Sequence, residues 1–313
     1  MSEIIKNFWN LDEKQFGRKI EFQDDFYVTL ISADDFKDFV YWPDELIPKK
    51  KNEYKIENKT FTNCSFAFTK FKNIIFQNCK FTNCKFNHAT IEDCRFHDCT
   101  FKYVNMFKVT IKKTYLEPDS FRNIIPNIRD FKGCIENANM CVTFFQEILD
   151  NSNDKGQPEH TKQADYHFRK WKGLNYIQKR FKPEKDNRRT SNWMFIKKFF
   201  PNLSLYLLTG YGYRIPNFLI VFIAGFSFFA CINHLNWKEY GLLKKDLSID
   251  VFNPLEPNLS STLYYTLDCT TKLVDSQFQA TTNFGMGWLT AQSLFGFFLL
   301  SALITIILNK FVR

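Results

Sequence analysis

From residue 61 the hydrophobic pattern of this 313-residue chain repeats at every fifth position. A helix with one buried face repeats every 3.6 residues and a half-buried strand every two, so neither element explains a period of five. A fixed repeat of this kind indicates stacked units that bury one continuous core. The apolar centres are Phe61, Phe66, Phe71, Phe76, Phe81, Phe86, Ile91, Phe96, Phe101, Met106, Ile111 and Leu116.

A second row of small or β-branched residues stands two positions before each centre after the first. It comprises Cys64, Thr69, Ile74, Cys79, Cys84, Ala89, Cys94, Cys99, Val104, Val109 and Thr114. With both rows, the segment resembles the pentapeptide-repeat family. That resemblance implies a right-handed quadrilateral β-helix over residues 54–118, with residues 1–53 as an N-terminal cap. Four repeats would form one coil, so Phe61, Phe81 and Phe101 would stack at the strand spacing of about 4.8 Å.

Five of the nine cysteines belong to this second row. We interpret them as small apolar fillers of the core, since Cys packs in this way. A zinc site needs CxxC-type spacing, which the five-residue interval does not supply; redox sensing is the remaining alternative. An odd count in a chain of this size does not suggest a disulfide scaffold. We therefore expect no metal and no cofactor.

The segments flanking the repeats are predicted from shorter patterns. Within the cap, Phe26–Ile31 (FYVTLI) predicts a strand, and Asp34–Trp42 predicts a helix that ends at Pro43. Residues 119–190 predict a helical linker, with helices over about 127–150 and 160–181. No nucleophile occurs with a base and an orienting group, so we expect no enzyme.

Residues 191–313 form a predicted membrane domain with apolar segments over about 215–235 and 286–308. At about 1.5 Å per residue each segment is about 30 Å long, enough to cross a bilayer core; a buried core helix is the alternative. A stretch over about 192–208 interleaves aromatic residues with Lys197 and Lys198, as in an interfacial helix. Basic residues concentrate before the first span and after the second, which predicts a cell-membrane protein with both termini in the cytoplasm.

Between the two spans a short apolar segment leads into Thr270–Thr271, a polar loop and then the long second helix. This order resembles the potassium-channel-like pore module of two-transmembrane ion channels. The resemblance implies a re-entrant pore helix and loop over about 260–276 and a homotetramer. Where that family has a Gly-Tyr/Phe-Gly-Asp filter, this chain has Lys272–Asp275 without glycine, so a potassium filter is not expected.

The candidate pore residues are of two kinds. Charged rings and hydroxyls near the filter would come from Asp268, Thr270, Thr271, Lys272 and Asp275. On the second span, Ser293, Ser301 and Thr305 would line the pore, with Gly296 as a hinge. In the alternative interpretation, the hydroxyls of the second span only bond the preceding helical turn.

The chain carries a net charge of +9, and basic residues outnumber acidic ones over the repeats. Some pentapeptide-repeat proteins imitate DNA with a negative surface; a positive surface argues against that role, and DNA is not expected as a partner. The lysines serve solubility or bind an anionic partner or lipid headgroups. Because one subunit cannot enclose a pore, a homo-oligomer is expected. We therefore expect a pore-forming channel-like protein whose β-helix recognises a partner or gates the pore; the alternative is a non-conducting membrane-tethered scaffold.

Overall fold

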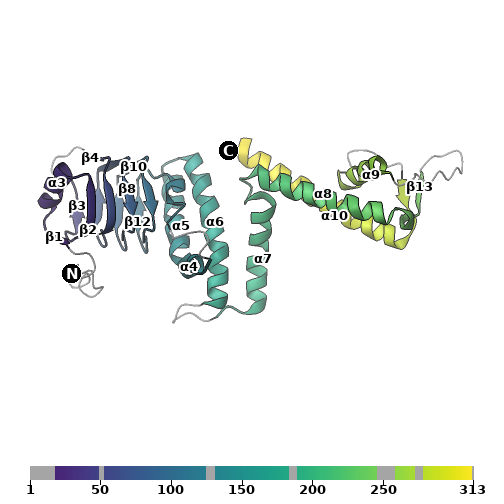
Figure 1. Cartoon of the computed structure of the whole chain (residues 1–313), viewed down its shortest axis with the longest axis horizontal. Helices are drawn as coiled ribbons and strands as arrows, with labels where there is room; N and C mark the ends of the chain where they lie inside the picture. Colours follow the sequence, from purple (N-terminus) through teal and green to yellow (C-terminus); the bar gives the residue numbers. More distant parts are fainter. Residues whose placement is uncertain are drawn as a thin grey trace. The chain divides into compact units, whose positions relative to one another are not determined.

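The computed structural model describes residues 18–48, 53–124, 131–182, 189–244, 258–271 and 278–311. The chain divides into two compact units, Met1–Asn202 and Leu203–Arg313. The first unit contains three parallel sheets followed by helices, and the second is mainly helical (Figure 1).

Short parallel strands build the repeat region of the first unit. The first sheet has the order β1 (Arg18–Ile20), β2 (Asp35–Tyr41), β5 (Thr60–Ser65), β8 (Lys80–Thr82) and β11 (Thr100–Lys102). The second has the order β10 (Arg95–His97), β7 (Ile74–Gln77) and β4 (Tyr54–Glu57). The third has the order β12 (Thr110–Lys112), β9 (Thr90–Glu92), β6 (Lys70–Lys72) and β3 (Glu45–Leu46). Isolated parallel bridges from Ser65 to Lys85 and from Lys85 to Asn105 form a fourth row. The predicted stacking of successive coils is confirmed.

Phenylalanine rings form continuous ladders inside the coils. Phe81 stacks on Phe61 with centroids 5.0 Å apart and on Phe101 at 4.9 Å, both within 8° of parallel. Phe121, beyond the last predicted repeat, extends the ladder by stacking on Phe101 at 4.1 Å. Neighbouring ladders meet edge to face, as between Phe76 and Phe81. Both arrangements are favourable for aromatic pairs, so the core gains more than its buried area alone would give.

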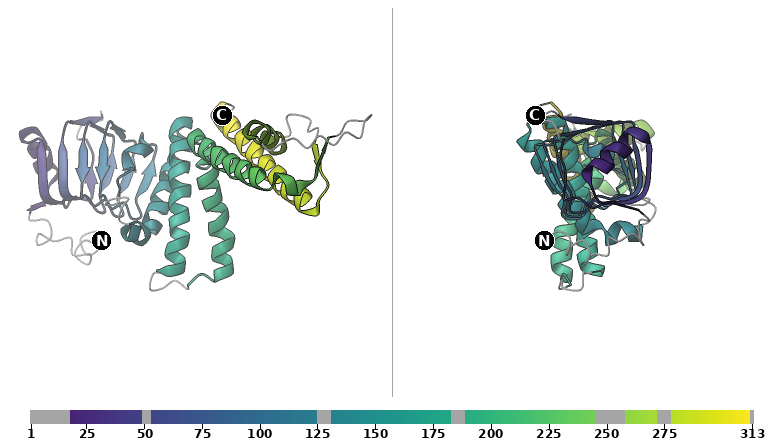
Figure 2. Two further views of the ribbon diagram at one scale, coloured as in Figure 1. Left: turned by 45° about the vertical axis from the view of Figure 1, so that its right-hand side comes forward. Right: turned by 90° about the vertical axis from the view of Figure 1, so that its left-hand side faces the viewer.

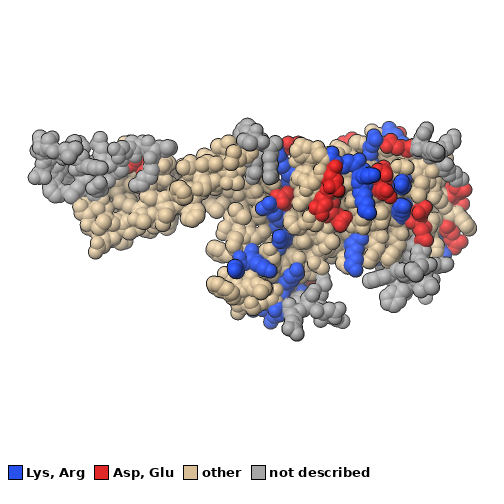
Figure 3. Space-filling model, turned by 180° about the vertical axis from the view of Figure 1, so that it is seen from behind, with Lys and Arg blue, Asp and Glu red and all other residues tan. Residues whose placement is uncertain are grey.

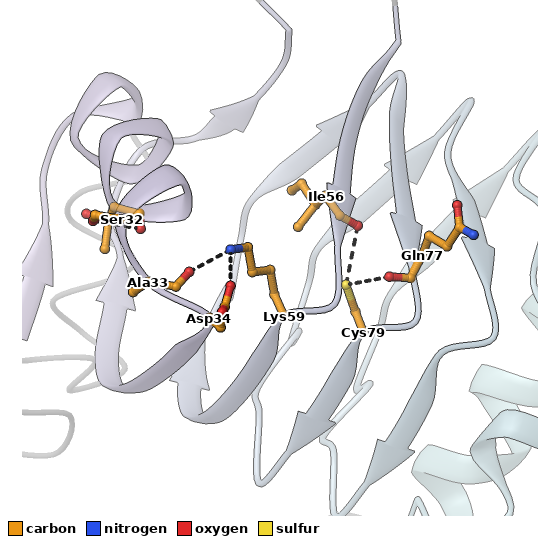
Figure 4. A network of polar contacts seen from close by, with 8 residues as sticks. Ser32, Ala33, Asp34, Ile56, Lys59, Gln77 and Cys79 are labelled. Carbon is orange, nitrogen blue, oxygen red and sulfur yellow. Dashed lines mark hydrogen bonds and ion pairs between the residues drawn. The ribbon is translucent and has the colours of Figure 1, made fainter.

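The second row is buried as predicted, with every member at most 3% exposed. Its cysteine thiols lie against backbone carbonyls. Cys79 Sγ, for example, is 3.4 Å from the carbonyl oxygens of Ile56 and Gln77 (Figure 4). The nine cysteines, all in the described ranges, form no disulfide. The interpretation of the repeat cysteines as buried fillers is confirmed.

The corners between strands have a left-handed backbone at every fifth residue. Their φ angles lie between 49° and 61° for Asn58, Asn63, Phe68, Asn73, Asn78, Asn83, His88, Asp93, Asp98, Tyr103, Lys108 and Lys113. Asn and Asp tolerate this conformation better than other non-glycine residues. Asn78 Nδ2 also donates to Asn58 Oδ1 at 2.7 Å, so side chains at the same corner of successive coils bond to each other.

The N-terminal segment differs from the prediction in both of its elements. Residues Gln23–Ser32 form helix α3, not a strand, and the segment predicted to be helical contains strand β2. Both predictions were wrong because the end of the coil decides the conformation. Phe26 and Leu30, one helical turn apart, are buried, and the Phe26 ring contacts the core ring of Phe66. Figure 2 (right) shows α3 lying across the end of the coils.

Strand β2 begins the coil earlier than predicted. It pairs Phe36 with Phe61, and the two rings stack at 5.0 Å. Lys59 ties this first coil to the end of α3, since its Nζ donates to the carbonyl of Ala33 at 2.7 Å and to Asp34 at 2.6 Å (Figure 4). A cation is favourable there because a helix C-terminus carries partial negative charge.

Helices cover the other end of the coils. After the short turn η1 (Pro118–Phe121) come α4 (Phe131–Glu136), α5 (Ala138–Asp154) and α6 (Pro158–Phe181). The Asn151 side chain on α5 replaces a further strand: Oδ1 accepts from the Thr114 amide at 2.9 Å, and Nδ2 donates to the Thr114 carbonyl at 2.7 Å. Glu147 accepts from the Ile111 amide at 3.3 Å. Side chains thus satisfy part of an edge that would otherwise be open to pairing.

A buried histidine joins this helical end to the last turn of the coil. His167 on α6 donates from Nε2 to Asp119 Oδ1 at 3.0 Å, and its ring stacks on Phe145. Burial lowers the pKa of His167 below its usual value, although Asp119 opposes this effect. Burial acts to raise the pKa of Asp119, but His167 and Arg122 together lower it. Both groups therefore favour the folded state more at neutral than at acidic pH.

We expect the first unit to lose stability as the pH falls below about 6.5, the ordinary histidine pKa. Because the folded-state pKa of His167 is depressed, the unfolded chain binds more protons in this range, and protonation favours unfolding. Urea unfolding followed by circular dichroism at pH 7.5, 6.0 and 5.0 measures the loss. His167→Gln should flatten the dependence without abolishing it, since the pKa of His88 is also lowered by burial. An unchanged slope in this variant would contradict the assignment.

The second unit consists mainly of helices. Helix α7 (Asn192–Thr209) crosses the division between the units and precedes α8 (Ile215–Leu235). After η2 (Trp237–Tyr240) and β13 (Leu242–Lys244) come α9 (Leu259–Thr271), β14 (Phe278–Ala280), which is antiparallel to β13, and α10 (Asn283–Phe311). α8 and α10 run antiparallel: Phe218 near the start of α8 and Ile306 near the end of α10 share one cluster.

Among the residues that the structure describes, two helices are long and apolar enough to cross a membrane: Ile215–Leu235 and Asn283–Leu308. Only 17% and 22% of their most apolar windows are buried, whereas the core helix of a soluble protein would be mostly buried. Figure 3 shows the contrast in charge: blue and red side chains alternate over the first unit, while the described helices of the second are almost entirely tan.

Candidate functional site

Helix α9 is the candidate site, because it is a short helix held between two helices of membrane length. Its 13 residues span about 20 Å, less than the bilayer core of about 30 Å. Its first turns contact the end of α8, where Thr262 Oγ1 lies 3.3 Å from His234 Nδ1. Its last turn contacts α10, where Ser293 Oγ donates to the Cys269 carbonyl at 3.2 Å. Helix α9 thus runs alongside α10, from near the start of α10 toward the middle of α10.

Asn233 on α8 is the centre of a buried hydrogen-bond network. It is fully buried. Its Oδ1 accepts from Tyr240 Oη at 3.0 Å and from Trp288 Nε1 at 3.1 Å. Its Nδ2 donates to Thr266 Oγ1 at 2.9 Å and to Gln292 Oε1 at 3.1 Å. All four hydrogen-bonding positions of the Asn233 amide are therefore occupied.

Gln292 on α10 completes the network toward α9. It is also fully buried, and its Nε2 donates to the Thr266 carbonyl and to Thr270 Oγ1, both at 2.8 Å. An amide without partners is costly in an apolar environment, so these contacts define where α9 lies between α8 and α10.

Gly296 marks the closest approach of α9 to α10. A Cβ atom at this position would lie 1.6 Å from the carbonyl oxygen of Thr270 and 2.6 Å from its carbonyl carbon. Gly296 stands near the middle of the candidate span Asn283–Leu308. The C-terminal end of α9 therefore reaches half-way along the second apolar helix, and only glycine leaves room for it.

The predicted filter residues fall partly outside the described structure. Lys272 and Asp275 lie outside the described residues. Asp268 is buried, and its Oδ1 has no hydrogen-bond partner among the described residues. Thr270 and Thr271 donate to the carbonyls of the preceding turn at 2.7 and 2.8 Å. The structure thus brings Asp268, Thr270 and Thr271 together on the last turns of α9.

The predicted residues of the second span separate into two groups. Ser293 and Gly296 face α9, through the contacts described above. Ser301 and Thr305 are exposed, and their hydroxyls donate at 2.9 Å to the carbonyls of Phe297 and Ser301. These are the bonds to the preceding turn that the alternative interpretation expects. α10 continues as one helix through Gly296.

The hydrogen-bond network around Asn233 and Gln292 was not predicted from the sequence. Asn233 and Gln292 each stand within an otherwise apolar segment, and polar side chains inside such segments commonly bond to a neighbouring helix. That signal was available, although it does not identify which residues pair.

On the β-helix, basic side chains do not form one continuous positive surface. In the third sheet Glu92 stands between Lys72 and Lys112 in register. Lys70 and Lys72 lie 3.9 and 3.6 Å from the Glu92 carboxylate. The excess of lysine in the sequence is thus partly paired on this face.

Comparison with known proteins identifies a known family in one part of the chain. Residues 57–110 match the family model described as pentapeptide repeats (9 copies). No curated protein has significant sequence similarity to the chain. The match covers strands β5 to β11 and the first residue of β12, and the coils of the structure extend beyond it, to β2 on one side and to Phe121 on the other. The chain therefore contains pentapeptide repeats, which form parallel sheets and are joined to a helical region with two helices that could span a membrane.

Proposed function

We propose that the chain is a subunit of a membrane pore. In this proposal α8 and α10 cross the bilayer, α9 is a re-entrant helix, and the repeats form a right-handed quadrilateral β-helix that recognises a partner or gates the pore from the cytoplasm. The observation that carries the proposal is the position of α9, whose C-terminal carbonyl at Thr270 meets Gly296 half-way along α10.

The exposed apolar surface of the second unit supports the membrane location. Large side chains of both long helices are exposed, among them Ile220, Ile223, Phe297 and Phe298 at 62% or more. An apolar surface of this extent on a soluble monomer would be a binding or aggregation surface, and lipid would cover it. The positive-inside rule then places both termini in the cytoplasm.

Helix α7 fits a position at the membrane surface. Trp193 and Phe200 are 75% and 65% exposed, and Lys197 and Lys198 lie on the same helix. Apolar side chains inserted at the acyl boundary, with lysines at the headgroups, are typical of an interfacial helix.

The end of α9 supports an oligomer around a central axis. A helix ending at membrane depth leaves carbonyl groups that must be buried in protein or meet water. The side of α9 away from the network remains exposed, with Tyr264 at 56% and Leu267 at 42%. Further copies of the chain would cover that side, and the family resemblance favours four. The negative end of the helix dipole and the buried Asp268 both favour a cation there.

A bilayer recording tests the proposal. The purified chain is reconstituted into planar bilayers, and reversal potentials are measured under a salt gradient. We expect Asp268→Asn to lower the cation-to-anion permeability ratio by about threefold or more, because rings of charge select by sign. Lys272→Glu should shift selectivity the opposite way. The control is Glu57→Gln, which removes an exposed, ion-paired charge from the β-helix.

Two results would reject the pore. One is the absence of current from well-reconstituted oligomers, and the other is identical selectivity in Asp268→Asn, Lys272→Glu and the control. Either result would favour the second candidate, a membrane-tethered scaffold without conduction. That candidate keeps the two spans and uses the β-helix as a binding surface. The lysines of the β-helix would then bind an anionic partner or lipid headgroups.

A further inference from the structure

The hairpin formed by α6 and the first half of α7 carries the positive charge of the chain. Residues 166–202 contain eleven basic residues and two acidic ones, and the net charge of the whole chain is +9, so the remaining residues together are neutral. Figure 3 shows blue side chains and no red ones on the projection in the lower middle of the view, where the end of α6 and the start of α7 lie. Such a concentration of one charge favours an anionic partner.

The tip of this hairpin, residues 179–182 and 189–193, has a defined structure. Arg189 Nε donates to the Arg180 carbonyl at 2.8 Å, and the Arg180 guanidinium donates to Asn192 Oδ1. The Phe181 ring meets the Phe195 ring edge to face, with centroids 5.8 Å apart. These contacts place the start of α7 beside the end of α6, as Figures 1 and 2 show.

The charges at the hairpin tip are largely uncompensated. Lys182 forms an ion pair with Glu136 at 2.7 Å, whereas Lys179, Arg180 and Arg189 have no carboxylate partner in the part of the chain that the structure describes. The C-terminal end of α6 supplies only about half a negative charge. Each guanidinium uses one of its five N–H donors in the bonds given above, so most of these donors remain for a ligand.

Exposed apolar side chains lie next to these cations. Phe181 is 58% exposed, and the Arg180 guanidinium lies 5.7 Å from the centroid of its ring. Trp193 is 75% exposed and begins a stripe on α7 that continues with Ile196 and Phe200, which are 53% and 65% exposed. Aromatic and aliphatic side chains beside basic ones are typical of surfaces that insert at the boundary between lipid headgroups and acyl chains.

We propose that the hairpin tip binds an anionic phospholipid, with Arg180 and Arg189 at the phosphate and with Phe181 and Trp193 among the upper acyl carbons. Guanidinium groups suit the phosphate because they can donate two parallel hydrogen bonds to its oxygens. A free phosphate ion or a nucleic-acid backbone would leave the apolar stripe in water, and a zwitterionic lipid would bring its own cation to the site. The inference rests on the membrane location proposed above and adds to it a lipid class and the residues that select it.

Native mass spectrometry of the full chain in detergent micelles tests the site. The chain is titrated with dioleoylphosphatidylglycerol or dioleoylphosphatidylcholine, and the bound lipids are counted. We expect phosphatidylglycerol to bind about tenfold more tightly or better, the usual contribution of two basic residues at an anionic surface. Glycerol phosphate, which is the headgroup without acyl chains, and a single-stranded oligonucleotide are the comparisons, and both should bind more weakly than phosphatidylglycerol.

Three variants examine the residues. Arg180→Gln with Arg189→Gln should lower the affinity for phosphatidylglycerol about tenfold and leave that for phosphatidylcholine unchanged. Lys112→Gln with Lys155→Gln removes the same charge from exposed positions elsewhere in the first unit and should have little effect. Trp193→Ser, at a position too exposed to matter for folding, should weaken the binding of phosphatidylglycerol but not that of glycerol phosphate.

Several results would overturn the lipid site. They are equal binding of the two lipids, binding of glycerol phosphate or of the oligonucleotide as tight as that of phosphatidylglycerol, and equal effects of the arginine and lysine double variants. A chain that stays in solution without detergent would reject the proposed function and this inference together. A chain that conducts in bilayers but does not prefer phosphatidylglycerol would reject this inference alone.

Discussion

Phe81→Ala should destabilise the β-helix by about 3–5 kcal/mol, the usual cost of removing a fully buried phenylalanine. Phe81 is 1% exposed, stacks on two rings along its ladder and meets Phe76 and Phe86 edge to face. Neighbouring coils cannot collapse into the gap, because the ladder hydrogen bonds fix their spacing. Hydrogen–deuterium exchange of peptides from β5, β8 and β11 should therefore accelerate by about two to three orders of magnitude.

Phe81→Leu provides the matched control for this prediction. Leucine fills most of the same volume but removes the stacking, so its cost should be much smaller than that of alanine. If alanine and leucine accelerate exchange equally, the ring ladder is not the source of the stability. If neither does, the coils are held by backbone pairing alone.

The repeat region was predictable because an apolar residue occupies the same position in every coil. The predicted start failed for a physical reason. Phe36, Tyr41, Leu46 and Ile56 keep the five-residue phase of Phe61, but Lys51 interrupts it. The first coil is also longer: Asp38 and Asn63 bond across 25 residues, whereas Asn58 and Asn78 bond across 20. The second row of small residues, which had defined the repeat, is also absent before Cys64.

The strand propensity of residues 26–31 did not predict their conformation, because these residues cover the open end of the coil as a helix. Val28, Thr29 and Ile31 favour a strand, yet Val28 and Ile31 are 66% and 82% exposed on α3. Phe26 and Leu30 decide the conformation, because a helix places both on the open end of the core. The position of that end could not be read from residues 26–31 alone.

The two long apolar helices were predictable from their length and polarity, whereas their contacts were not. Sequence marks Asn233 and Gln292 as unusual, but they are 59 residues apart and nothing in the chain pairs them. Gly296 shows the same limit. A glycine in a long helix indicates either flexibility or close packing, and only the carbonyl of Thr270 beside it distinguishes the two.

Gly296→Ala should release α9 from α10. Alanine normally stabilises a helix interior relative to glycine by about 0.5–1 kcal/mol. Here its Cβ would stand 1.6 Å from the Thr270 oxygen, so α9 must move away by more than an ordinary van der Waals adjustment. That movement breaks the bonds from Gln292 to Thr270 and from Ser293 to Cys269. With overpacking at about 1–3 kcal/mol and each lost bond at about 0.6, we expect a net loss of about 3 kcal/mol.

Gly287→Ala on the same helix is the control, because a Cβ there would meet nothing within 4 Å. It should be neutral or slightly stabilising, so the two alanines are expected to act with opposite sign. The measurement is hydrogen–deuterium exchange of the α9 peptide, residues 259–271, in lipid nanodiscs. Gly296→Ala should raise its exchange by about two orders of magnitude, and Gly287→Ala should not. A hinge at Gly296 predicts another result: alanine would leave α9 protected and would change only the bending of α10. If α9 stays protected in both variants, Gly296 is not needed for the packing of α9, and its role is flexibility of α10.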